Sequence, residues 1–322
     1  FIITGGSGFV GQFLIRKLLS LYPESHIHNL DIHHPTSLSF SNLSNHIIDL
    51  TDQQSLKSFK FSENDIVYHL AAYIFTDQVP PKAKREGWFE SLNVYGTQNL
   101  LAAMEENGAK NIAFISTDMV YGSPQTNPID INHPLNPNGP YGLSKIKAEQ
   151  LIGDFCARSD CRSIIFRPRM IVGPGRFGLL NRLFFLIRNN LPVPLIGSGK
   201  NYYQLVSIHD CVDALIEFHE QDDSSGIYHL GSTDPLPRVI DLIKFIIKKA
   251  GSSSFLIPTW GKGAKAILSF LDTVNLTLLY PEQFTVADQN YILDIRGLTE
   301  NLNVHPKYND KDILLEAYRS YC

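Results

Sequence analysis

The hydrophobic positions in the first half of the chain alternate between two kinds of segment. Short apolar runs rich in β-branched residues are separated by longer stretches that carry apolar residues on one helical face. This alternation is typical of βαβ units whose strands form a doubly wound parallel sheet, so the sequence predicts an α/β fold. The expected strands are Phe1–Thr4, His26–Asp31, His46–Ile48, Ile66–Leu70, Asn111–Ser116 and Ser163–Arg167, and the expected helices are Phe9–Leu21, Gln53–Phe59, Trp88–Asn107 and Tyr141–Arg158.

The alternation ends after Gly173, where glycine and proline divide the chain into short pieces. We therefore expect one sheet domain over residues 1–172 and a smaller, irregular lobe over residues 173–322, with some segments of the lobe returning to the first domain. The apolar stretch Ala264–Leu279 is interrupted by Lys265 and Asp272. It is expected to be a packing helix rather than a helix that lies in a membrane interface.

Composition narrows the class of protein. The 322 residues are 43% hydrophobic and carry a net charge of −4, so there is no basic field for nucleic acid or an anionic membrane. The four cysteines form no CxxC pair, and neither a disulfide framework nor a metal site is expected. Without an apolar run of membrane-spanning length, the sequence predicts a soluble cytoplasmic protein. Because Phe1 already lies in a strand, a few native residues are expected before it.

The first strand leads into a glycine-rich turn. Thr4-Gly5-Gly6-Ser7-Gly8-Phe9-Val10-Gly11 places glycines where a strand turns sharply into a helix and a pyrophosphate can approach backbone N–H groups. Asp31 follows Gly11 by twenty residues, at the end of the next strand. A carboxylate there accepts hydrogen bonds from ribose hydroxyls and repels a 2′-phosphate. The pattern predicts a Rossmann-type sheet that binds NAD in preference to NADP.

A second motif carries acid/base chemistry. Tyr141 and Lys145 lie four residues apart on an expected helix, so both side chains project from one face. A nearby ammonium favours the phenolate, which suits Tyr141 to move the proton of an alcohol while hydride leaves its carbon. Thr117, at the end of an earlier strand, offers a hydroxyl to the same oxygen.

Together these motifs resemble the extended short-chain dehydrogenase/reductases of the NAD-dependent epimerase/dehydratase family, over nearly the whole chain. The similarity also includes Asp49-Leu50, His69-Leu70-Ala71-Ala72, Asn93 to Leu100, Ser116 to Gly122, Arg167-Pro168 and Gly173-Pro174-Gly175. It implies a Thr117, Tyr141, Lys145 triad and a homodimer formed through helices 88–107 and 141–158. The cofactor positions it implies are Gly5, Gly8, Phe9, Val10, Gly11, Asp31, Asp49, Leu50, Leu70, Ala71, Ala72, Tyr141 and Lys145. Asn93 is read as structural support.

The chain departs from the family at substrate positions. Sugar 4,6-dehydratases carry an Asp-Glu pair after the triad threonine, but here Asp118 is followed by Met119, which cannot act as a base. Nucleotide-sugar epimerases usually have an asparagine and an arginine where this chain has Met170 and the run 201–204. Nearby basic residues could grip a diphosphate instead: Arg169, Arg176, Arg182, Arg188 and Lys200. The candidate substrate residues are Asp118, Met119, Arg169, Arg176 and Tyr203.

Three functions remain open at this point. The leading hypothesis is an NAD-dependent epimerase or ketoreductase of a nucleotide-activated sugar. The Arg-Pro-x-x-x-x-Gly-Pro-Gly pattern and the apolar insert before Asp294 also resemble 3β-hydroxysteroid dehydrogenase-like members, with Leu179, Leu180, Leu183, Phe184 and Phe185 able to line an apolar pocket. The third is a catalytically silent NAD-binding sensor, against which the intact triad argues.

Overall fold

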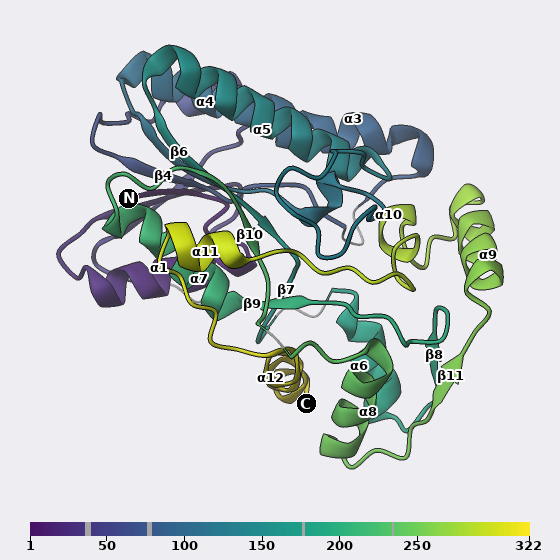
Figure 1. Ribbon diagram of the computed structural model, residues 1–322. Coiled ribbons are helices and arrows are strands. Elements are labelled where there is room, and N and C mark those ends of the chain that lie inside the picture. The colour runs from purple at the N-terminus through teal and green to yellow at the C-terminus, as the bar shows by residue number, and fades with distance from the viewer. Residues whose placement is uncertain (36–39, 76–78, 176–177, 234) are drawn as a thin grey trace.

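The computed structural model describes residues 1–35, 40–75, 79–175, 178–233 and 235–322. Its centre is a parallel sheet of seven strands in the order β10-β6-β5-β4-β1-β2-β3 (Figure 1). This arrangement confirms the predicted α/β, Rossmann-type fold. The strands are β1 (Ile2–Thr4), β2 (Ile27–Asp31), β3 (Leu43–Ile47), β4 (Ile66–His69), β5 (Asn111–Ile115), β6 (Arg162–Pro168) and β10 (Gly226–Leu230).

Helices cover both faces of this sheet (Figure 1). Successive side chains of a strand point to opposite faces, so Ile2 packs with the α4 and α5 side whereas Ile3 packs with α1 and α7. Burial on both faces explains why these strands are nearly continuous apolar runs. The helices of the two faces are α3 (Arg85–Glu90), α4 (Thr97–Asn107) and α5 (Pro140–Ser159), and α1 (Phe9–Leu21), α7 (Ile208–Glu220) and α11 (Arg296–Asn301), with α2 (Gln53–Lys57) beside α4.

The strand order reverses between β1 and β4, because β2 and β3 extend the sheet in one direction and β4, β5, β6 and β10 in the other. In open α/β sheets the carboxyl ends of the strands at such a reversal form a crevice. The glycine turn after β1 and the loop after β4 therefore meet at the same edge.

The remaining elements form a smaller layered region with its own apolar core around Phe184, Ile246 and Ile313. Two short parallel pairs, β7 with β9 and β8 with β11, belong to this region. Within the described residues, no helix combines the length and hydropathy needed to cross a bilayer. The elements are β7 (Met170–Val172), α6 (Leu180–Arg188), β8 (Val193–Leu195), β9 (Leu205–Ser207), α8 (Val239–Lys249), β11 (Leu256–Pro258), α9 (Gly261–Thr273), α10 (Pro281–Phe284) and α12 (Asp310–Tyr321).

Two predicted segments need correction, and one strand comes in addition to those predicted. The strand expected at His46–Ile48 begins earlier, as β3, because the polar residues Ser44 and Asn45 also pair with β2 at this edge. The helix expected over Trp88–Asn107 contains a π-helical turn at Ser91–Gly96 between α3 and α4. Strand β10 was not predicted, since it follows a region whose pattern looked irregular.

Candidate active site

The glycine-rich turn after β1 packs its backbone directly against the loop after β4 and against the start of α1. Gly5 has φ of +72°, and a Cβ there would lie 2.7 Å from the backbone nitrogen of Ala71. A Cβ on Gly11 would lie 2.4 Å from Cα of Gly6, so helix α1 can start this close to the turn only with glycine at that position. Gly8 is the N-cap of α1 and no side chain caps it. The N-terminus of α1 therefore faces the cleft with backbone alone, which suits a phosphate group.

Asp31 is held beside this turn at the end of β2. One carboxylate oxygen accepts the N–H of Ser7 at 2.9 Å, and the other accepts the N–H of His33 at 3.0 Å. These bonds orient the carboxylate at the edge of the crevice. Asp49 instead accepts two hydrogen bonds from Thr51, both at 2.8 Å, and is exposed.

One cleft of about 290 Å³ brings together the residues expected for catalysis. Thr117 reaches it from the end of β5, and Tyr141 and Lys145 reach it from the first two turns of α5. The Thr117 hydroxyl donates to Asp118 Oδ1 at 3.3 Å and accepts the N–H of Met119 at 3.2 Å. The Tyr141 ring packs against Phe75, at 5.0 Å between ring centroids.

The cleft is lined by most of the predicted cofactor and substrate residues. The structure places Gly5, Gly8, Phe9, Val10, Gly11, Leu70, Ala72, Asp118, Met119, Arg169 and Tyr203 in its wall. Asp31, Asp49, Leu50 and Ala71 lie outside that lining, although the N–H of Ala71 donates to Thr4 Oγ1 at 3.3 Å. Arg176 lies outside the described residues.

Lys145 is buried, with its ammonium nitrogen 4.0 Å from the centroid of the Phe114 ring. Burial lowers the pKa of Lys145 to about 7, against the opposing charge of Glu149. An amine with a pKa near neutrality changes its charge easily in the working range of an enzyme. The lowered pKa of Lys145 results from the packing around it, and the sequence motif alone does not predict it.

A buried hydrogen-bonded histidine lies next to Lys145. His69 Nδ1 is 2.7 Å from Thr4 Oγ1, and His69 Nε2 is 2.9 Å from Thr97 Oγ1. Burial lowers the pKa of His69 to about 3, and the charge of Lys145 adds to the shift. The ring is therefore neutral, and it joins strands β1 and β4 to helix α4 beneath the cleft.

Asn93 supports the site from the π-helical turn. Its side chain accepts the N–H of Tyr73 at 2.7 Å and donates to the Tyr73 carbonyl at 3.1 Å. It also donates to Ser144 Oγ at 2.9 Å. These contacts tie the loop after β4 to helix α5, three residues beyond Tyr141.

Asp118 and Arg169 form a buried ion pair in the wall of the cleft. The guanidinium carbon lies 4.1 Å from the centroid of the Tyr203 ring and 4.0 Å from that of Tyr291. Burial raises the pKa of Asp118, and Arg169 opposes that change. Arg169 is a predicted candidate to bind a diphosphate. The structure pairs its Nη1 atom with Asp118, while its Nε and Nη2 atoms have no hydrogen-bond partner among the described residues.

Glu282 is a site residue that no sequence motif indicates. It comes from α10, yet its Oε1 atom accepts the backbone N–H of Tyr141 at 3.0 Å. A Cβ on Gly139 would lie 2.4 Å from the Glu282 carboxyl, so the two segments are in close contact. Burial raises the pKa of Glu282, and the Tyr141 N–H opposes that change. Glu282 of the smaller region thus caps the N-terminus of α5, which belongs to the sheet domain.

Comparison with known proteins shows which family the chain resembles. The model of the NAD dependent epimerase/dehydratase family matches residues 1–231. The chain is 29% identical to the dTDP-D-glucose 4,6-dehydratase of Mus musculus, over 77% of this chain and 72% of the relative. It is 34% identical to the N-acetyl-α-D-glucosaminyl-diphospho-ditrans,octacis-undecaprenol 4-epimerase of Escherichia coli O157:H7, over 66% of this chain and 60% of that protein.

Among solved structures, DesIV, a dTDP-glucose 4,6-dehydratase from Streptomyces venezuelae crystallised with NAD and TYD, superposes with a TM-score of 0.78. The match covers 99% of this chain and 96% of DesIV at 23% identity, which establishes a shared fold. With the family match over residues 1–231, these comparisons place the chain among enzymes. The chain belongs to the NAD-dependent epimerase/dehydratase family.

Proposed function

We propose that the chain is an NAD-dependent epimerase or ketoreductase of a nucleotide-activated sugar. The observation that carries the proposal is the meeting of Thr117, Tyr141 and Lys145 in the cleft that the glycine turn also lines. The relatives support the choice of an activated sugar, because those compared are named for sugars carried on a diphosphate.

The residues present fit NAD. A side chain on Gly5 would collide with the backbone of Ala71, and one on Gly11 would collide with Gly6, so the glycines keep the turn tight. The uncapped N-terminus of α1 suits the pyrophosphate. Asp31 is placed to accept the adenosine ribose hydroxyls. When bound, NAD supplies the acceptor for a hydride from the alcohol carbon.

The chain itself supplies the proton transfer. Tyr141 takes the proton of the substrate hydroxyl as the carbon loses hydride, and Thr117 hydrogen-bonds the same oxygen. Lys145, one helical turn from Tyr141, favours the phenolate when it is charged and is also expected to hold the nicotinamide ribose. An epimerase would then reduce the ketone on its opposite face, whereas a ketoreductase would run the step in reverse with reduced cofactor, and Tyr141 would give its proton to the ketone oxygen.

The same wall of the cleft disfavours dehydration. Elimination of water needs an acid and a base beside the ketone, but Asp118 is paired with Arg169 and Met119 has no basic site. The identity to a 4,6-dehydratase therefore does not carry that reaction to this chain. We assign the cofactor to residues 1–172 and the choice of substrate mainly to residues 173–322.

One observation favours a second candidate, an NAD-dependent dehydrogenase of a bulky apolar alcohol. Many of the side chains that line the cleft are apolar. They include Ile74, Phe75, Met170, Ile171, Leu179 and Leu180.

The test is to incubate the protein with NAD and, in turn, uridine and thymidine diphosphate sugars, and to follow the configuration of the sugar carbons by proton NMR. Tyr141→Phe protein is the control. We expect an epimerised or oxidised sugar with wild-type protein only. NADH formation with a steroid alcohol, and none with the sugars, would favour the second candidate. If the protein binds NAD but converts neither the sugars nor the steroid alcohol, the result would favour the catalytically silent NAD-binding sensor.

A further inference from the structure

Helix α9 and the loop that follows it expose an unusually apolar surface. Trp260 is 76% exposed, Ile267 63%, Phe270 66% and Leu276 64%. Val274 and Leu278 are exposed as well. Single exposed apolar residues need no explanation, but a contiguous group of large ones marks an interaction surface. The packing helix expected over residues 264–279 is present only as far as Thr273, where α9 ends, and Asp272 is the buried residue of that helix.

The exposed apolar positions follow the helical period. Gly263, Ala266, Ile267, Phe270 and Val274 recur at i, i+3, i+4, i+7 and i+11, which is one face of a helix. A Cβ on Gly263 would lie 2.5 Å from the Trp260 ring, so that ring lies on the same face at the start of α9. We call these residues, together with Leu276 and Leu278, the α9 face.

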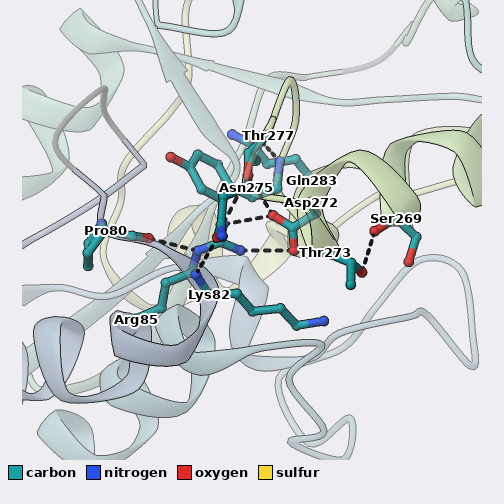
Figure 2. Close-up of polar contacts among 10 residues, drawn as sticks. Pro80, Lys82, Arg85, Ser269, Asp272, Thr273, Asn275, Thr277 and Gln283 are labelled. Atoms are coloured by element: carbon teal, nitrogen blue, oxygen red, sulfur yellow. Dashed lines mark hydrogen bonds and ion pairs between the residues drawn. The ribbon is translucent and has the colours of Figure 1, made fainter.

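The opposite side of α9 is clamped to the body of the protein, as Figure 2 shows. Asp272 forms a buried ion pair with Arg85 of α3, at 2.7 Å. Arg85 also donates to the Pro80 carbonyl at 3.2 Å and to Thr277 Oγ1 at 3.0 Å. The ion pair between Asp272 and Arg85 therefore fixes the orientation of α9 and leaves the α9 face exposed.

Unpaired positive charges border the α9 face. Lys262, Lys82 and Lys84 are exposed and make no ion pair with any described residue. The backbone N–H of Lys82 donates to Asn275 Oδ1 at 3.4 Å, which places Lys82 beside the exposed loop after α9.

The acidic side chains of residues 255–290 are either paired with a basic side chain or buried. Within residues 255–290, Asp272 pairs with Arg85, Asp288 pairs with Lys265, and Glu282 is buried against the N-terminus of α5. Across residues 80–90 and 255–290 the exposed lysines, Lys82, Lys84 and Lys262, outnumber the one exposed acid, Glu86, so this border is positive although the whole chain carries −4. An apolar helical face with an aromatic ring at its end and lysines at its border is the pattern of a helix that lies in the interface of an anionic bilayer.

The α9 face continues to the mouth of the cleft. Arg182 of α6 donates to the carbonyl of Leu278, and Leu179, three residues before Arg182, lines the cleft. Gln283, which follows Glu282 in α10, also lines it. A surface that docks against the α9 face would lie close to the entrance for substrate.

We propose that the α9 face docks on an anionic lipid bilayer and holds the mouth of the cleft at the lipid surface. A sugar whose diphosphate is anchored in the bilayer by a lipid can then reach Tyr141 without leaving the membrane. This second step rests on the proposed function, whereas the docking itself does not. A second copy of the chain fits the α9 face less well, because a symmetric contact would place the bordering lysines of the two copies together.

Vesicle sedimentation tests the docking. Wild-type protein should sediment with phosphatidylcholine vesicles that contain phosphatidylglycerol, and less with phosphatidylcholine alone or at high salt. The Ile267→Glu/Phe270→Glu variant should bind at least about tenfold more weakly, because it places two charges in the apolar face. Leu21→Glu, an exposed apolar position at the end of α1, is the matched control and should bind like wild type.

Tryptophan fluorescence gives a second readout that does not depend on activity. The chain has two tryptophans, and the Trp88→Phe variant leaves only Trp260. Its emission should move to shorter wavelength on addition of anionic vesicles, because the indole enters the interface. Equal sedimentation of wild type and the double variant, or no vesicle binding by wild type, would overturn the proposal. So would self-association in ultracentrifugation that the double variant abolishes while vesicles have no effect.

The substrate step has its own assay. The double variant should lose turnover of a lipid-diphosphate sugar presented in vesicles and keep turnover of the same sugar on a soluble nucleotide. Equal turnover of the vesicle-borne sugar by both proteins would refute this step. If wild-type protein binds vesicles but turns over neither sugar with NAD, the proposed function fails and the docking surface stands.

Discussion

Lys145 should destabilise the cofactor-free protein near neutral pH, and its replacement by methionine tests this directly. Lys145 is buried, and burial lowers its pKa from 10.5 to about 7. The folded state therefore loses stability as pH falls below 10.5, and the full loss is reached below about pH 7. A difference of 3.5 units between the folded and unfolded pKa corresponds to about 5 kcal/mol, of which about 4 kcal/mol is present at pH 7.

Methionine has a similar shape and carries no charge, so Lys145→Met should remove this cost. It also removes the contact of the ammonium with the Phe114 ring, worth about 1–2 kcal/mol when buried. We expect a net gain of about 2 kcal/mol at pH 7, or a rise in the melting temperature of roughly 3 °C. Turnover should nevertheless fall at least about 100-fold, because the charge beside Tyr141 is lost.

The assay is thermal unfolding of both cofactor-free proteins between pH 6 and 10. The advantage of Lys145→Met should shrink steadily as pH rises toward 10, since the wild-type lysine is then neutral in more of both states. Lys147→Met is the control. Lys147 is paired with Glu90 near the surface, so its loss should cost about 0–1 kcal/mol. A variant no more stable than wild type at pH 7, or an advantage independent of pH, would refute the reasoning.

Four further predictions concern the site and the assembly. Tyr141→Phe should keep the fold and NAD affinity but lose about 100- to 10,000-fold in turnover, and a loss within about threefold would remove Tyr141 from the mechanism. Asp31→Ala should weaken NAD and relax its preference over NADP in direct titrations, and a wild-type preference for NADP would show the role given to Asp31 to be wrong. Because of Met119, no 4-keto-6-deoxy product should form from nucleoside-diphosphate glucose or mannose; loss of water seen by mass spectrometry would contradict this. Light scattering at micromolar concentration should give the mass of a dimer, formed through helices 88–107 and 141–158, and a monomer mass would refute it.

The sequence alone determined the elements whose signals are local. The glycine motif follows from the sharp turn that brings Gly5 against Ala71. The consecutive apolar residues Ile2 and Ile3 indicate a strand that is buried on both faces. Tyr141 and Lys145 lie one helical turn apart whatever else the chain does. For these reasons the fold and the membership of the family could be predicted before any coordinates were known.

Tertiary structure alone decided which charges and surfaces remain available. Arg169 looks like a free cation in the sequence, but packing pairs it with Asp118 between two tyrosine rings. Glu282 reaches the N-terminus of α5 from 141 residues away, a separation at which no local pattern operates. The apolar run of α9 is compatible with a buried or an exposed helix. The ion pair of Asp272 with Arg85 turns one face inward and leaves the other to the surface, because burial depends on which elements meet in space.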